Sequence, residues 1–144
     1  MVMLRGIRNL TAALWLGLIA TLGGVVAPLL FSVLERTQAG ALAGQLFRIE
    51  AHVALALGVV LLIIERRFAA QRPLMGAVSR LSAELLLVLG ALFCTVLGFF
   101  ALQPLMAAAR AGQGSWTFGQ LHAASSGLFL LKGVCLLALV WRLR

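Results

Sequence analysis

The order of apolar and polar positions divides the chain into four long apolar runs separated by short connections that carry arginine. The runs cover residues 10–34, 49–64, 81–106 and 118–141. About 20 residues at 1.5 Å per residue cross the ~30 Å hydrocarbon layer of a bilayer. The second run is the shortest, and residues 44–47 can extend it backwards. This pattern predicts an all-α fold, an integral membrane four-helix bundle that forms a single transmembrane domain over residues 1–144.

The composition supports a bilayer environment. Hydrophobic residues make up 62% of the 144 residues and charged residues only 11%, whereas soluble domains average roughly half and a quarter. Too few polar residues remain to cover the core of a soluble domain of this length. We therefore expect lipid to be the main partner of the surface.

The formal net charge of +8 would suit a nucleic-acid partner if the basic residues were clustered. They are instead distributed in small groups between the apolar runs. In such positions, arginines orient helices and contact anionic lipid headgroups. We therefore expect no nucleic-acid partner.

The arginines also predict the orientation, because short cytoplasmic connections carry the excess of Lys and Arg. The larger group lies on one side of the predicted bundle and the smaller group on the other. The larger group is Arg5, Arg8, Arg66, Arg67, Arg72, Arg80, Arg142 and Arg144, and the smaller is Arg36, Arg48 and Arg110. This count predicts that the N- and C-termini are cytoplasmic and that connections 35–48 and 110–117 lie outside.

The first run is longer than the hydrophobic core of a signal peptide and lacks a clear cleavage site. We expect it to be retained as the first transmembrane helix. The chain is therefore predicted to be a multi-pass protein of the cell inner membrane.

Two prolines and several small residues predict where helices bend and where they touch. Pro28 and Pro104 lie late in the first and third runs, where proline removes a backbone hydrogen bond and bends the helix. Each bend could open a small outward-facing cavity. Small residues repeat every fourth position at Gly90, Cys94 and Gly98, and again at Ala20 and Gly24, which is typical of close helix contacts.

A weak similarity between the two halves of the sequence suggests two similar hairpins. A proline falls late in the first helix of each half, and a Phe followed by a His opens the second, as Phe47 with His52 and as Phe118 with His122. A parallel repeat would relate the halves by an axis along the membrane normal. Chance similarity is the competing explanation.

Two ionisable residues, Glu84 and Lys132, fall inside the apolar runs. Charged groups inside a membrane are costly and need a partner or a function. If the third and fourth helices are antiparallel neighbours, these two side chains are predicted to form an intramembrane ion pair. That pair would be structural, with Lys132 otherwise extending toward headgroups, or it would belong to a proton or ion pathway.

Two histidines, His52 and His122, each lie about one turn inside the outer end of a predicted helix, so we expect them at one depth. Two imidazoles facing across a bundle could bind a transition metal or a haem iron, and Glu50 could add a carboxylate. No HxxxH or CxxC spacing accompanies them. Water, lipid phosphate or backbone carbonyls are the competing partners.

No catalytic motif stands out along the chain. It contains no Asp, no nucleophile elbow, no Walker motif and no dinucleotide-binding glycine pattern. Cys94 and Cys135 fall within apolar runs, where a structural disulfide of the secreted kind is not expected. The sequence therefore favours a non-enzymatic protein over an enzyme.

Four short motifs, taken in order, carry a family resemblance: Leu14-Trp15-Leu16-Gly17, Ala27-Pro28-Leu29-Leu30-Phe31, Ala43-Gly44-Gln45-Leu46-Phe47 and Phe118-Gly119-Gln120-Leu121-His122-Ala123-Ala124-Ser125-Ser126. The chain resembles a bacterial family of small four-helix membrane proteins of unknown function, the DUF4149 type, which is similar to transmembrane protein 205. The resemblance implies a fold without an established activity. In the family a glycine follows the histidine of the fourth helix, and here Ala123 follows His122.

Size and architecture are also similar to copper-resistance D type membrane domains and to the haem-carrying J-type protoporphyrinogen oxidases. The oxidase pattern, however, places a histidine in the first helix, and residues 10–34 contain none. This difference weakens the enzyme hypothesis.

Three functional hypotheses follow. The leading one is a non-enzymatic accessory or scaffold protein that packs against another membrane protein or forms a homo-oligomer through its small-residue faces. The second is a metal- or haem-handling protein that uses His52 and His122. The third is a small ion or proton-coupled transporter that uses Glu84 and Lys132.

Overall fold

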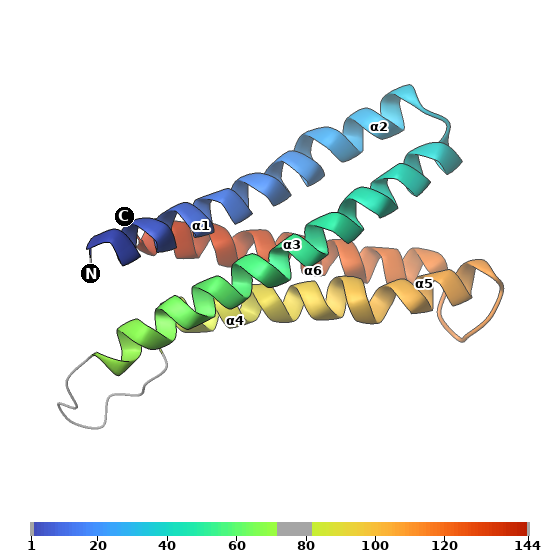
Figure 1. Cartoon of the computed structure of the whole chain (residues 1–144). Coiled ribbons are helices and arrows are strands. Elements are labelled where there is room, and N and C mark those ends of the chain that lie inside the picture. Colours follow the sequence, from blue (N-terminus) through green and yellow to red (C-terminus); the bar gives the residue numbers. More distant parts are fainter. Residues whose placement is uncertain (1, 72–81, 144) are drawn as a thin grey trace.

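The computed structural model describes residues 2–71 and 82–143 and is all-helical over them (Figure 1). Four helical segments are long and apolar enough to cross a membrane, which confirms the predicted number of spans. Their elements are α1 (Val2–Thr21), η1 (Leu22–Val26), α2 (Ala27–Val33), α3 (Arg36–Ala70), α4 (Ala83–Thr95), η2 (Val96–Ala101), α5 (Leu102–Arg110) and α6 (Phe118–Arg142). The labels η1 and η2 denote single π-helical turns.

The second span differs most from its prediction, because α3 begins at Arg36 and not near residue 49. The expected connection 35–48 is reduced to the two residues Leu34 and Glu35 between α2 and α3. Hydropathy misplaced this boundary because helix formation depends on backbone propensity and packing, not on apolarity. The early turns of α3 are rich in alanine, and Ala39 and Ala43 are buried.

The remaining boundaries agree more closely. The first span begins eight residues early, at Val2, and the fourth ends at Arg142, one residue beyond the prediction. The predicted start of the third span at Leu81 lies outside the described residues, as do Arg72, Arg80 and Arg144.

Local capping explains where the later helices start and stop. The Ser82 hydroxyl accepts a hydrogen bond from the Leu85 amide and caps α4, and Thr117 forms a reciprocal capping box with Gln120 at the start of α6. At the end of α5, the Gln113 amide donates to the Ala108 carbonyl, and Gly112 has a φ of +72°. This is the glycine C-cap that satisfies the last carbonyls of a helix.

Both transmembrane prolines follow a π-helical turn. Pro28 is the second residue after η1, and Pro104 is the third residue after η2. Proline lacks an N–H and its ring crowds the carbonyl four residues earlier, so a locally widened turn absorbs the misfit without ending the helix. Each hairpin therefore has a π-helical turn before its proline, which adds to the similarity between the two halves of the sequence.

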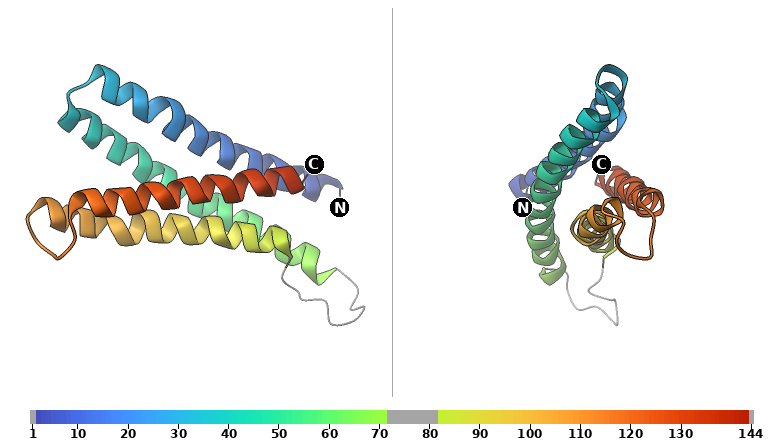
Figure 2. Two further views of the ribbon diagram at one scale, coloured as in Figure 1. Left: turned by 180° about the vertical axis from the view of Figure 1, so that it is seen from behind. Right: turned by 90° about the vertical axis from the view of Figure 1, so that its right-hand side faces the viewer.

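The spans form two hairpins, one running from α1 through α3 and the other from α4 through α6 (Figure 1). Helix α1 packs on α3 and α6, α4 packs on α6, and α3 packs on α4. We call the end with both chain termini the terminal end and the opposite end the distal end. Toward the distal end, the turn between α2 and α3 diverges from the connection between α5 and α6 (Figure 2).

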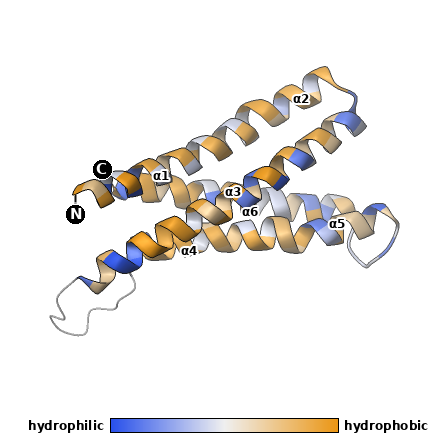
Figure 3. Cartoon of the chain, in the orientation of Figure 1, coloured by the Kyte–Doolittle hydropathy of each residue, from blue (hydrophilic) through white to orange (hydrophobic). Residues whose placement is uncertain are grey.

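Apolar side chains dominate both the core and the outer faces of the helices. Trp15, Leu61, Leu136 and Leu139 are fully buried. Hydrophobic positions continue around the outside, and hydrophilic ones gather near the helix ends and in a band midway along α3 (Figure 3). This distribution suits a bundle surrounded by lipid.

The small residues predicted to mediate helix contacts divide into two groups. Gly90 and Gly98 lie against α6, where a Cβ added to Gly98 would be 3.2 Å from the Leu128 Cβ. The Ser125 hydroxyl donates to the Gly98 carbonyl at 2.8 Å. By contrast, Ala20 and Gly24 are exposed, and a Cβ added to Gly24 would meet no heavy atom of the described chain within 4 Å.

Gly98 of η2 and Gly24 of η1 provide a matched test of this packing. We expect Gly98→Leu to lower the free energy of unfolding by about 1–3 kcal/mol, because the new side chain overpacks the contact of η2 with α6. Gly24→Leu should leave it near the wild-type value, since a Cβ there meets no heavy atom within 4 Å. Unfolding in mixed micelles, followed by circular dichroism, measures both. Equal stability of the two variants would contradict the packing.

Candidate functional site

An ion pair between Glu50 of α3 and Lys132 of α6 lies inside the bundle. The Lys132 ammonium donates to both carboxylate oxygens of Glu50, at 2.8 and 2.9 Å. The side chains are only 3% and 4% exposed, so lipid and water are excluded from both charges. We call these two residues the central pair.

The central pair lies close to mid-depth. Lys132 is the fifteenth of the 25 residues of α6 and is about 15 Å along the axis from its C-terminal end. The ammonium also lies 4.9 Å from the centre of the Phe129 ring, which packs edge-on against Phe47. The pair therefore joins the two hairpins through one ionic contact with an aromatic pair beside it.

The structure does not bring Glu84 and Lys132 together, although the sequence predicted that pairing. Glu84 instead accepts a hydrogen bond from Arg142 Nε at 2.9 Å. The contact of Glu84 with Arg142, and that of Gly90 with Cys135, place Lys132 about nine residues deeper along α4 than Glu84. That separation is about 13 Å, farther than a lysine stem extends.

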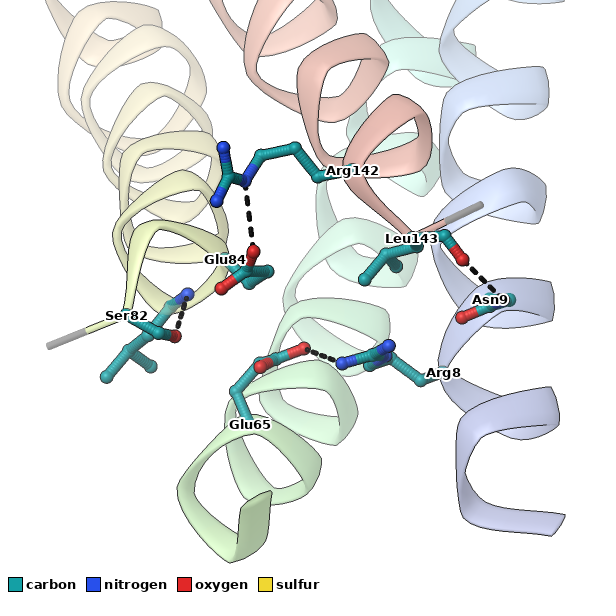
Figure 4. A network of polar contacts seen from close by, with 8 residues as sticks. Arg8, Asn9, Glu65, Ser82, Glu84, Arg142 and Leu143 are labelled. Carbon is teal, nitrogen blue, oxygen red and sulfur yellow. Dashed lines mark hydrogen bonds and ion pairs between the residues drawn. The ribbon is translucent and has the colours of Figure 1, made fainter. Parts of the chain in front are cut away.

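The contact of Glu84 with Arg142 is one of several hydrogen bonds and ion pairs at the terminal end, which we call the terminal cluster (Figure 4). Arg8 of α1 lies 3.4 Å from Glu65 of α3. The Asn9 amide donates to the Leu143 carbonyl at 2.9 Å, which joins α1 to the end of α6. Together these contacts link the four helix ends, and the polar groups would lie near the headgroups of a bilayer.

The two histidines lie on α3 and α6, and different segments contact them. His52 meets Phe100 of η2, and Gly98, two residues before Phe100, accepts a hydrogen bond from Ser125, which is three residues after His122. Helix α3 begins at Arg36, 13 residues earlier than expected, so His52 is farther from the start of its helix than His122 is from the start of α6.

Each imidazole has its own neighbours. His52 Nδ1 lies 2.7 Å from the Arg48 carbonyl, and its ring meets Phe100 edge-on. His122 stacks on Phe118 of its own helix. Over residues 2–71 and 82–143, no three His, Cys, Asp or Glu side chains gather in a group that could hold a metal ion. Both cysteines are free thiols.

The divergence of the hairpins leaves a cavity of about 360 Å³ near the distal end, between α3 and the segment formed by η2 and α5. We call it the distal cavity. Its polar lining comes from Gln45 and Arg48 of α3 and from Gln103 and Arg110 of α5. Gln103 directly precedes Pro104, so the cavity borders the segment where the sequence predicted a bend.

Sequence reasoning missed Glu50 as the partner of Lys132. It regarded Glu50 as an interfacial neighbour of His52, because the second helix was expected to begin at residue 49. The helical propensity of the alanine-rich segment from Ala39 to Ala43 was the available signal. The observed helix begins at Arg36 and carries Glu50 about four turns inward, to the middle of the bundle.

The central pair predicts a large difference between single and double substitutions. Lys132→Met should lower the free energy of unfolding by about 3–5 kcal/mol, because it leaves the Glu50 carboxylate buried without its partner. Adding Glu50→Leu should restore most of that loss. Arg142→Met is the control and should cost about 0–1 kcal/mol, because Arg142 is 52% exposed. Unfolding titrations that give additive effects for Lys132 and Glu50 would contradict a direct pair.

Comparison with known proteins gives one family match. The family model described as Domain of unknown function (DUF4149) matches residues 10–115, more than two thirds of the chain. No curated protein and no solved structure matches the chain. The matched segment includes both π-turns, Glu50 and the polar lining of the distal cavity, and it ends before α6. This match confirms the predicted resemblance to the DUF4149 type, three of whose four motifs lie within the matched residues, and the chain belongs to the DUF4149 family, whose function is unknown.

Proposed function

We propose that the protein is a non-enzymatic accessory protein of the inner membrane that binds a transmembrane helix of a partner. The supporting observation is a row of small residues on the outer face of α1 and η1. We call Ala13, Gly17, Ala20 and Gly24 the small-residue stripe; all four are exposed. Their spacing of four, three and four residues keeps them on one side of the helix.

The glycines of this stripe differ from those inside the bundle. A Cβ added to Gly17 or Gly24 would meet no heavy atom of the described chain within 4 Å, whereas one added to Gly23 would be 2.7 Å from Phe129. Glycine lowers helix propensity by about 1 kcal/mol relative to alanine. Small residues on a membrane helix permit close backbone approach by a second helix. A partner helix would pack against Gly17 and Gly24, where the described chain leaves open space.

The ionisable groups are consistent with this proposal. Three of the four glutamates, Glu50, Glu65 and Glu84, each bind a cation on another helix. These contacts hold the helices of one chain together and would present the small-residue stripe on a defined surface. Such a role needs no catalytic group.

Site-specific photo-crosslinking in the native membrane tests the proposal. A photoreactive residue at Ala20 should form a defined adduct, whereas one at Leu137, which is 57% exposed on α6, should not. Gly17→Leu combined with Gly24→Leu should reduce the Ala20 adduct by about tenfold, since two added side chains separate the helices.

The mass of the adduct identifies the partner as a second copy or as another protein. The same two leucines should leave the unfolding of the isolated chain unchanged. Adduct formation that is equal at both positions, or that is insensitive to the two leucines, would refute the accessory role.

A second candidate function rests on the depth of the central pair. Ionisable residues near the middle of a membrane commonly serve proton or ion pathways. In a proton-coupled role, the Glu50 carboxylate would take up and release a proton, and Lys132 would hold the Glu50 side chain in position. This hypothesis replaces Glu84 by Glu50 as the carboxylate that acts with Lys132.

Reconstituted liposomes containing a pH-sensitive dye test this second function. Glu50→Gln should abolish a proton flux that the wild-type protein supports. The exchange of both residues, Glu50→Lys with Lys132→Glu, keeps a pair of opposite charges and serves as the stability control. Liposomes that show the same flux with wild-type protein and Glu50→Gln would exclude the proton pathway.

A further inference from the structure

The distal cavity carries an inference that is independent of the accessory role. Its lining combines two guanidinium groups, from Arg48 and Arg110, with two side-chain amides, from Gln45 and Gln103. The side chains come from different hairpins, so the cavity exists only in the folded bundle. Gly44 and the Phe99 ring contribute less polar parts of the wall.

Both guanidinium groups are free of acidic partners. Within residues 2–71 and 82–143, neither Arg48 nor Arg110 has a carboxylate oxygen within 4.0 Å. The Arg110 guanidinium lies over the Phe118 ring at 4.4 Å. A stacked guanidinium keeps the N–H groups of its edge available for hydrogen bonds. The cavity therefore has excess positive charge and unused donors.

The depth of Arg48 makes its lack of a partner significant. Arg48 lies 12 residues, or about 18 Å, along α3 from its first residue, Arg36. A cation at this depth requires a counter-charge or a water-filled cavity. The nearby Glu50 carboxylate does not serve as this counter-charge, because both of its oxygens accept hydrogen bonds from the Lys132 ammonium.

We propose that the distal cavity binds an anionic phosphate group through Arg48 and Arg110, with Gln45 and Gln103 donating from either side. Arginine matches phosphate oxygens with paired N–H donors, and several donors around one group suit a multi-oxygen anion. A volume of 360 Å³ lies near the lower end of the range for small-molecule sites. A phospholipid headgroup and free inorganic phosphate present the same chemistry.

Arg36 provides the matched control for charge. It is exposed at the first position of α3, near the same end of the bundle, and does not line the cavity. A merely electrostatic attraction of the distal end to anionic lipid would respond equally to the loss of any arginine there. If the cavity is a specific binding site, binding should weaken on loss of Arg48 and Arg110 and not on loss of Arg36.

The experiment measures binding to the purified full-length chain in mild detergent. Native mass spectrometry counts bound phosphatidylglycerol, with phosphatidylcholine as the zwitterionic comparison, and calorimetry measures inorganic phosphate alone. The Arg48→Gln, Arg110→Gln double variant should bind the anionic probe at least about tenfold more weakly. Arg36→Gln should bind it as the wild type does.

A steric variant tests the cavity without changing its charge. Gly44→Leu should fill the space, because a Cβ at Gly44 meets no heavy atom within 4 Å and points to no helix contact. Gly127→Leu on the exposed face of α6 is its control, since the added Cβ there is equally unobstructed. Gly44→Leu should weaken binding while Gly127→Leu does not.

The two probes distinguish the sources of the phosphate. Retention of phosphatidylglycerol without inorganic phosphate binding identifies a headgroup site, and binding of inorganic phosphate identifies a soluble anion. The proposal is overturned if the wild type binds neither probe, if Arg36→Gln weakens binding as much as the double variant, or if Gly44→Leu leaves binding unchanged. Melting temperatures of all variants verify that each is folded.

Discussion

The contact of Lys132 with Glu50 is the constraint on which the arrangement of the bundle depends. A lone charge at mid-depth would be strongly unfavourable, so each residue requires the other. The two residues belong to different hairpins, and their contact sets the register of α3 against the parallel helix α6. Van der Waals packing between apolar helices tolerates sliding far better than a two-oxygen ionic contact does.

That register has consequences at both ends of the molecule. At the terminal end it is compatible with Arg8 meeting Glu65 and with Glu84 meeting Arg142, so the helix ends are tied by polar groups. Toward the distal end the hairpins diverge, and the distal cavity lies beside α3 and α5 (Figure 2). The π-turns before Pro28 and Pro104 keep the long helices continuous through this region.

The molecule thus combines paired carboxylates with two features that have no partner within the described chain, the small-residue stripe and the arginines of the distal cavity. The paired carboxylates serve helix packing, a common role for buried ion pairs and weak evidence of activity by itself. The small-residue stripe of α1 lacks a packing partner within the described chain, and Arg48 and Arg110 lack acidic partners there. These unpartnered features support binding functions more directly than catalysis.

Hydrophobic periodicity and composition determined the all-helical fold and the four spans, because a bilayer requires long, internally hydrogen-bonded apolar segments whatever their neighbours are. Short motifs similarly sufficed for the family. Tertiary structure decided the partners. The sequence showed that Lys132 needed a carboxylate, but only the true start of α3 and its register with α6 selected Glu50 over Glu84. The early start of α3 likewise placed Arg48 beside the distal cavity, because contacts across helices depend on depth and facing, which hydropathy does not encode.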